Sequence, residues 1–62
     1  MNIIFHEQIS VRLDKFLVGQ NLKQIYSRSL IDKLIENGNI KVDGKTVKKS
    51  HPLKYGEEIS ID

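Results

Sequence analysis

The sequence contains no cysteine and no tryptophan, and it has no long run of apolar residues. Without cysteine, disulfides, cysteine-ligated zinc sites and thiol nucleophiles are all excluded. Small secreted domains usually depend on such cross-links, so their absence favours a reducing compartment. The longest apolar runs, Ile3-Ile4-Phe5 and Phe16-Leu17-Val18, are far too short for a signal-peptide core or a membrane span. We therefore expect a cytoplasmic protein with no membrane partner.

The chain is also short and has few residues suited to catalysis. Its 62 residues fit one domain, which we place at residues 1–62. His6 and His51 lack the spacing of a zinc site, and no nucleophile motif surrounds Ser27 or Ser29. No glycine-rich loop follows a predicted strand, so nothing indicates a nucleotide cradle. We expect no catalytic residue, no metal site and no small-molecule cofactor in this chain.

Charge is unevenly distributed along the sequence, although the formal net charge is only +2. Residues 41–54 hold five lysines against Asp43, whereas residues 55–62 hold three acidic residues and no basic one. A basic stretch beside an acidic end indicates a surface with one electropositive side. A solvated, lysine-rich hairpin is the alternative interpretation of the same run.

Two segments have the period of amphipathic helices. In the first, the spacing of apolar residues predicts a helix over Val11–Val18 that stops near Gly19, with Ser10 as its N-cap. In the connector that follows, Leu22 and Ile25 are expected to tuck under the helices.

The second helix is expected to begin after Ser27, another N-cap candidate. It should end at Asn37-Gly38, because glycine accepts the left-handed conformation that often closes a helix. Its apolar stripe consists of Leu30, Ile31, Leu34 and Ile35.

A change of period from 3.6 to 2 after the second helix predicts a hairpin. Asp43-Gly44 is a strong signal for a two-residue turn between strands at residues 40–42 and 45–48. In this register Lys41 points away from the helices, whereas the apolar residues face them. The register pairs Ile40 with Val47 and Lys41 with Thr46.

Two further strands complete the expected fold, one at residues 2–6 and one at residues 58–61. The sequence therefore predicts an α+β domain in which a two-helix unit packs on a small, mostly antiparallel sheet. The expected core consists of Leu13, Phe16, Leu17, Leu30, Ile31, Leu34, Ile40, Val42, Val47 and Ile59.

Basic residues on the predicted helices indicate a nucleic-acid-binding surface. Arg12 and Lys15 lie three positions apart, off the apolar face of the first helix. Arg28 opens the second helix, where free N–H groups and the helix dipole favour a phosphate. The alternative interpretation pairs Arg28 with Asp32 in an ordinary surface ion pair. Other members of the patch are Ser27, Ser29, Lys33 and the hairpin lysines Lys41, Lys45, Lys48 and Lys49.

Several sequence blocks follow one another over residues 10–61. They are Arg12-Leu13-Asp14-Lys15-Phe16-Leu17, then Ser27-Arg28-Ser29, then Leu34-Ile35 with Gly38, Ile40 and Val42-Asp43-Gly44-Lys45, then Leu53-Lys54-Tyr55-Gly56-Glu57 with Ile59. In this order they resemble the S-four RNA-binding domain, the module named after small-subunit ribosomal protein four. The resemblance implies a two-helix RNA-binding unit on a small sheet, the arrangement called the alpha-L motif.

By this resemblance the helix pair and the following hairpin grip structured RNA, and we expect that RNA to be ribosomal RNA and the domain to be a monomer. The family usually has Asn-Gly where this chain has Asp43-Gly44, which places a negative charge beside the RNA. It often has Pro-Gly-Asp where this chain has Tyr55-Gly56-Glu57, a change compatible with the same turn. The expected RNA-binding residues are Arg12, Lys15, Ser27, Arg28, Ser29, Lys33, Lys41, Asp43, Gly44, Lys45 and Lys48.

The strand before the first helix is most similar to the front of pseudouridine synthases that modify large-subunit ribosomal RNA. In those enzymes the domain precedes a larger catalytic domain that works without a cofactor, so we expect this chain to be part of a longer enzyme. This branch of the pseudouridine synthases has a catalytic aspartate in an Arg-Leu-Asp motif. Here Val11 and Lys15 flank that motif in place of the required residues, so we expect Asp14 to pair with a basic neighbour or to remain solvated.

Three alternatives stay open at this point. One is a stand-alone RNA-binding protein of the same fold that acts on ribosomes. Another is the front of an RNA methyltransferase. The third, from a different class, is a protein-interaction module whose basic face meets an acidic partner.

Overall fold

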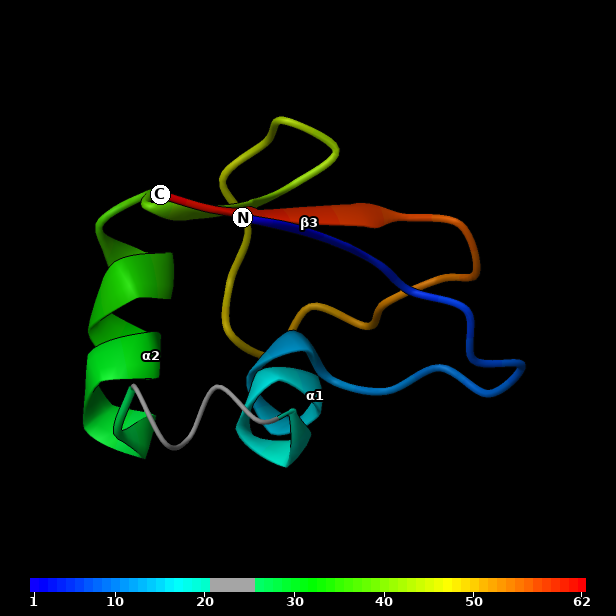
Figure 1. Cartoon of the computed structure of the whole chain (residues 1–62), viewed down its shortest axis with the longest axis horizontal. Coiled ribbons are helices and arrows are strands. Elements are labelled where there is room, and N and C mark those ends of the chain that lie inside the picture. Colours follow the sequence, from blue (N-terminus) through cyan, green and yellow to red (C-terminus); the bar gives the residue numbers. More distant parts are fainter. Residues whose placement is uncertain (21–25) are drawn as a thin grey trace.

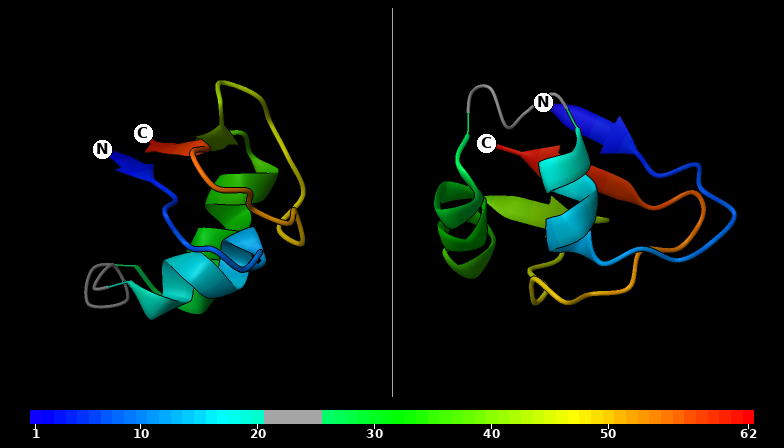
Figure 2. Two further views of the ribbon diagram at one scale, coloured as in Figure 1. Left: turned by 90° about the vertical axis from the view of Figure 1, so that its right-hand side faces the viewer. Right: turned by 90° about the horizontal axis from the view of Figure 1, so that it is seen from below.

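Two helices cover one face of a three-stranded antiparallel sheet in the computed structural model of the chain, which describes residues 1–20 and 26–62 (Figure 1). The elements follow the order β1 (Asn2–Ile4), α1 (Leu13–Gly19), α2 (Arg28–Glu36), β2 (Ile40–Val42) and β3 (Glu58–Ile61). Views from the side and from below show both helices on the same side of the sheet (Figure 2). The predicted α+β architecture is confirmed.

The last strand, β3, lies at the centre of the sheet, between β1 and β2. Its register places Ile59 opposite both Ile3 and Val42, so these three side chains share the face that packs on the helices. The two chain ends lie side by side at one end of the paired strands β1 and β3, where the amino group of Met1 donates to the carbonyl oxygen of Ile61 at 2.9 Å. The fold is therefore closed by contacts between residues far apart in the sequence.

The predicted turn at Asp43-Gly44 is confirmed, but the hairpin beyond it is wrong. Both turn residues have positive φ, 51° and 77°, as a two-residue hairpin turn of type I′ requires. Only Val42 and Lys45 then pair as a bridge. Ile40 lies opposite Ile61 and Lys41 opposite Ser60, in place of Val47 and Thr46.

The segment after this turn crosses to the first helix, which explains why it does not continue the hairpin. The backbone N–H of Leu13 donates to His51 O at 2.9 Å, and that of Asp14 donates to Lys49 O at 3.0 Å. These carbonyls satisfy N–H groups that the first turn of a helix leaves unpaired. The segment therefore serves as a backbone cap for α1.

This backbone cap also corrects the predicted start of the first helix. Helix α1 begins at Leu13, two residues later than expected, and Arg12 occupies the N-cap position without a side-chain hydrogen bond. Ser10 is not the N-cap. Residues 11–12 are extended instead, and Leu53 donates its N–H to Val11 O at 2.9 Å. The helix therefore begins where the carbonyls of the distant segment accept from its first N–H groups, and not where Ser10 could serve as an N-cap.

The second helix follows its sequence signals closely. Ser27 is the N-cap of α2, and its hydroxyl oxygen accepts from the Leu30 N–H at 3.1 Å. At the other end, Gly38 has φ +81° and donates to Ile35 O at 3.2 Å, while Asn39 donates to Leu34 O at 2.9 Å. This pair of bonds is a Schellman motif, as the glycine position predicts.

The core lies between the helices and the sheet. Phe5 and Phe16 meet edge to face, with ring centroids 5.1 Å apart. Leu30 is expected in this core but is 39% exposed. It directly precedes Ile31 in the helix, so it points to a different side of α2 from the buried pair Ile31 and Ile35. The expected packing of Leu22 and Ile25 concerns positions outside the described residues. Buried residues that the expected core omitted are Phe5, Ile35, Leu53 and Ile61.

Candidate nucleic-acid interface

Lys15 on α1 and Arg28 on α2 line the same hollow between the two helices. The hollow has a volume of about 230 Å³, and Asp14 and Val18 complete its lining. Both basic side chains belong to exposed residues. The structure therefore brings together, from separate helices, two cations that the sequence assigned to phosphate binding.

Arg12 is held at the edge of this region by an ion pair with Asp14. Its Nε donates to Oδ1 at 3.2 Å and its Nη2 donates to Oδ2 at 3.0 Å. The Asp14 side chain is only 6% exposed, whereas that of Arg12 is 46% exposed. Two bonds leave other N–H donors of the guanidinium available for a phosphate. Asp14 thus pairs with a basic neighbour, which confirms the first of the two expectations for it.

The start of α2 adds a third component to the site. Ser29 and Lys33 are exposed on the solvent side of the helix, beside Arg28. The first backbone N–H groups of a helix point outward without intrahelical partners, and together with the dipole they favour an anion. We call the group Arg12, Lys15, Ser27, Arg28, Ser29 and Lys33 the helix surface.

Arg28 forms no ion pair with a carboxylate in the part of the chain that the structure describes. The expected alternative pairing with Asp32 is absent, because Asp32 instead meets Lys49 Nζ at 3.8 Å. Its recorded surroundings are those of the hollow that it lines together with Lys15.

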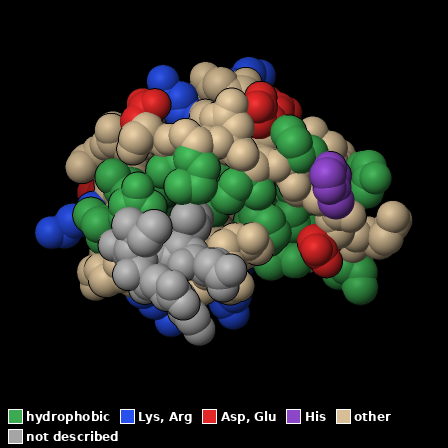
Figure 3. All heavy atoms as spheres, viewed as in Figure 1, with side chains coloured by type: hydrophobic (Ala, Val, Ile, Leu, Met, Phe, Trp, Pro, Cys, Tyr) green, Lys and Arg blue, Asp and Glu red, His purple; other side chains and the backbone are tan. Residues whose placement is uncertain are grey.

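The hairpin residues lie apart from the helix surface. The turn of Asp43, Gly44 and Lys45, which we call the hairpin tip, projects on the side of the sheet away from the helices (Figure 1). Lys41 lies opposite Ser60 on β3, out of the buried face of the sheet. In the space-filling view, Lys and Arg side chains lie along the lower edge of the molecule and, separately, along its upper edge (Figure 3).

Asp43 has a structural role at the hairpin tip. Its Oδ1 accepts from the Glu58 N–H at 2.9 Å, and its own N–H donates to Glu58 O at 2.8 Å. These two bonds attach the turn to the start of β3. The carboxylate is therefore engaged by the protein backbone.

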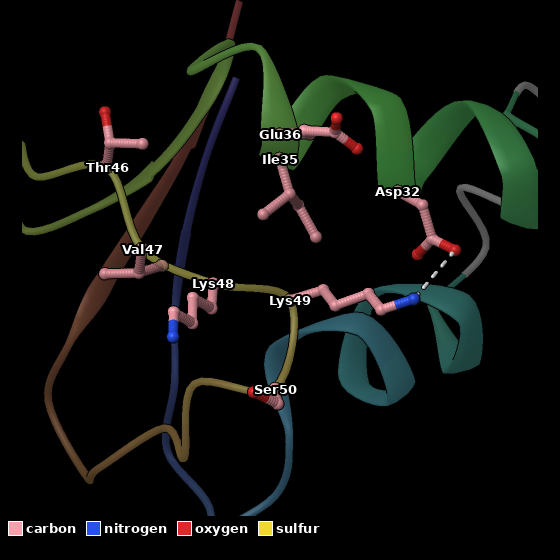
Figure 4. A pocket seen from close by; sticks show the side chains of 8 residues that line it. All are labelled: Asp32, Ile35, Glu36, Thr46, Val47, Lys48, Lys49 and Ser50. Carbon is pink, nitrogen blue, oxygen red and sulfur yellow. Dashed lines mark ion pairs between the residues drawn. The ribbon is translucent and has the colours of Figure 1, made fainter.

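Lys48, the remaining candidate, lies in the segment that follows the hairpin tip and crosses to α1. It lines a second hollow, of about 460 Å³, between this segment and α2 (Figure 4). We call this hollow the α2 groove. Sequence reasoning included the lysines of this segment in a general basic patch but missed the groove, since no local spacing relates them to α2. The other lining residues are Asp32, Ile35, Glu36, Thr46, Val47, Lys49 and Ser50.

The described residues hold no group of three or more side chains arranged to bind a metal ion. None of the helices that the structure describes has the length and apolar character needed to cross a membrane.

A family model matches most of the chain. The family is the S4 domain, and the match covers residues 11–59, from the approach to α1 into β3. The chain belongs to the S4 domain family. A search of curated proteins gave no significant match, and neither did a search of solved structures. S4 domains are generally RNA-binding domains, so the family and the two-cation hollow point to the same kind of partner.

Proposed function

We propose that this S4 domain binds structured ribosomal RNA through its helix surface and acts as the substrate-recognition domain of a pseudouridine synthase. The observation that carries the binding surface is the hollow shared by Lys15 and Arg28, beside the capped start of α2. Two cations from different helices around one depression, next to helix N–H groups, form a suitable site for a phosphate.

The residues of the helix surface determine what kind of recognition the domain performs. Lysine and arginine contacts to phosphate position a protein on nucleic acid but carry little sequence information. Recognition of folded RNA relies largely on the shape of the duplex and its loops. The domain therefore selects an RNA shape and holds it, while Lys45 at the hairpin tip and Lys48 contribute long-range attraction.

The enzyme context is supported by the N-terminal part of the chain. Strand β1 precedes the residues that the family model matches and pairs with the central strand β3. A strand in this place, followed by the Arg-Leu-Asp and Ser-Arg-Ser blocks, is what resembles the front of pseudouridine synthases. The helix surface then holds the RNA while a separate catalytic domain isomerises the uridine. In this proposal the catalytic group lies in that separate domain, and Asp14 is paired with Arg12.

Two experiments test the enzyme context. The coding sequence should continue past the codon for Asp62 into a catalytic domain of this class, and a stop codon there would contradict the proposal. In cells that carry the complete protein, Arg28→Glu should reduce pseudouridine at its target positions in ribosomal RNA. Lys54→Glu is the matched control, because Lys54 is an exposed lysine outside both the helix surface and the α2 groove. Equal pseudouridine levels in the two variants would count against the proposed role of the helix surface.

A further inference from the structure

The α2 groove combines an apolar lining with carboxylates on one wall and lysines on the other. Ile35 is buried beneath the groove, whereas Val47 is only partly buried and offers aliphatic surface to an occupant. Asp32 and Glu36 come from α2, whereas Lys48 and Lys49 come from the facing segment. Its volume of about 460 Å³ falls within the range of about 300–1,000 Å³ that is typical of small-molecule sites.

The groove adjoins the helix surface along the same helix. Arg28, Asp32 and Glu36 are spaced four residues apart and therefore follow one flank of α2. At a rise of about 1.5 Å per residue, Glu36 lies about 12 Å from Arg28 along the helix axis. An RNA strand whose phosphate is bound at Arg28 thus has its next nucleotides near the groove.

Carboxylates in an RNA-binding surface select against phosphate and in favour of base edges. Asp32 and Glu36 repel an anion but accept hydrogen bonds from the N–H groups of a base, in the way that Asp and Glu accept from exposed amino groups. Guanine presents two neighbouring donors, N1–H and the N2 amino group, which match the two oxygens of one carboxylate. Uracil presents a single N–H between two carbonyl oxygens, which a carboxylate repels.

Asp32 is only weakly paired, and one of its oxygens is closed off from the surface. Its Oδ2 forms an ion pair with Lys49 Nζ, which the dashed line in Figure 4 marks, and the separation of 3.8 Å is too long for a hydrogen bond. Its Oδ1 is buried, and no described residue donates to it. Because Oδ1 is closed off from the groove, Glu36, which is exposed and also lines the groove, is the carboxylate that an occupant can reach.

We propose that the α2 groove receives one unpaired guanine base of the bound RNA. The base packs on Val47, its N1–H and N2–H groups donate to Glu36, and Lys48 faces the neighbouring phosphate. This inference rests on the proposed RNA-binding function and adds a base-specific contact to it. Recognition of an unstacked base by packing and edge hydrogen bonds is the usual route to sequence specificity in RNA.

The test uses RNA hairpins in which each loop position in turn carries guanosine, inosine or uridine. At one position, replacing guanosine by uridine should weaken binding of the full chain about ten-fold, since a good bidentate base contact discriminates by about 1–3 kcal/mol. Inosine, which lacks the N2 amino group, should have an intermediate effect. Glu36→Gln should abolish the discrimination, whereas Glu7→Gln, an exposed glutamate outside the groove, should retain it.

The outcomes separate this inference from the proposed function. If no loop position discriminates guanosine from uridine, or if Glu36→Gln retains the discrimination, the guanine site is wrong. Binding that remains sensitive to Arg28→Glu in those cases leaves the RNA-binding function intact. If no hairpin binds at any salt concentration, both the guanine site and the proposed function fail.

Discussion

The guanidinium of Arg12 and the carboxylate of Asp14 form a two-bond ion pair at the first turn of α1, with N–O distances of 3.2 and 3.0 Å. Asp14 Oδ1 also accepts from the Lys15 N–H at 2.8 Å, and the Asp14 N–H donates to Lys49 O. The Asp14 carboxylate thus connects a cation of the helix surface to the first turn of α1, while the Asp14 backbone N–H connects that turn to the segment behind it. The aspartate of the Arg-Leu-Asp block is thus occupied by contacts within the protein.

Asp14→Ala should lower the free energy of unfolding by about 1–2 kcal/mol. The change removes three hydrogen bonds to a buried carboxylate, but Arg12 is half exposed and can be solvated, which limits the loss. Urea denaturation followed by circular dichroism measures the change. Glu7→Ala, at an exposed residue, is the control and should change stability by less than about 0.5 kcal/mol. Equal stability of the two variants would show that the Asp14 bonds do not stabilise the fold.

Gly38→Ala should destabilise the domain by about 1–2 kcal/mol. Gly38 has φ +81°, and a side chain in the left-handed region carries a cost of this size. The added Cβ would lie 3.5 Å from Thr46 Oγ1, an ordinary contact, so the backbone conformation and not a clash is responsible.

Gly19→Ala is the matched control for this substitution. Gly19 is the last residue of α1, and no atom of the residues that the structure describes lies within 4 Å of an added Cβ. Alanine there should leave stability unchanged or raise it by up to about 1 kcal/mol. A melting temperature that falls equally in both glycine variants would contradict the Schellman geometry at Gly38.

Leu53→Ala should cost about 2–5 kcal/mol, a loss comparable to the whole stability of so small a domain. Leu53 is fully buried, whereas Leu30 is 39% exposed, so Leu30→Ala should cost far less. Thermal unfolding followed by circular dichroism distinguishes them. A larger effect at Leu30 than at Leu53 would favour the core expected from sequence over the core in the structure.

Lys15 and Arg28 should be energetically coupled in RNA binding, because they line one hollow. In a double-mutant cycle, the Glu substitutions at these two positions should be non-additive by more than about 0.5 kcal/mol. Lys45→Glu combined with Arg28→Glu should be additive, since the hairpin tip lies on the other side of the sheet. Fluorescence anisotropy with a ribosomal RNA hairpin measures both cycles. Equal coupling in the two cycles would contradict the separation of these surfaces.

The parts of the fold that local chemistry determines could be predicted from the sequence. The N-cap at Ser27, the Schellman glycine at Gly38 and the turn at Asp43-Gly44 each depend on a few neighbouring residues, and all three are confirmed. The predicted α1 start failed because carbonyls of Lys49 and His51, more than thirty positions away, replace a side-chain cap.

In the hairpin and in the candidate site, too, some features depend on neighbouring residues and others on contacts between distant parts of the chain. The turn was right, but the strand that pairs with β2 is β3, a long-range partner that no local pattern specifies. For the site, helical spacing and cap position sufficed to select Lys15 and Arg28. The groove formed by Asp32 and Lys49 could not be predicted, since only the tertiary fold brings these residues together.

The most direct test of RNA binding at the helix surface is a salt titration of anisotropy with a ribosomal RNA hairpin. The chain should show a log–log slope equivalent to about 3–6 phosphates, at about 0.7–0.9 per contact. Arg28→Glu should weaken binding and reduce the slope by about one contact or more, whereas Lys54→Glu, with the same change in charge, should retain most of the affinity. If the two variants bind equally, or if the unaltered chain does not bind at low salt, the helix surface is not where this domain holds RNA.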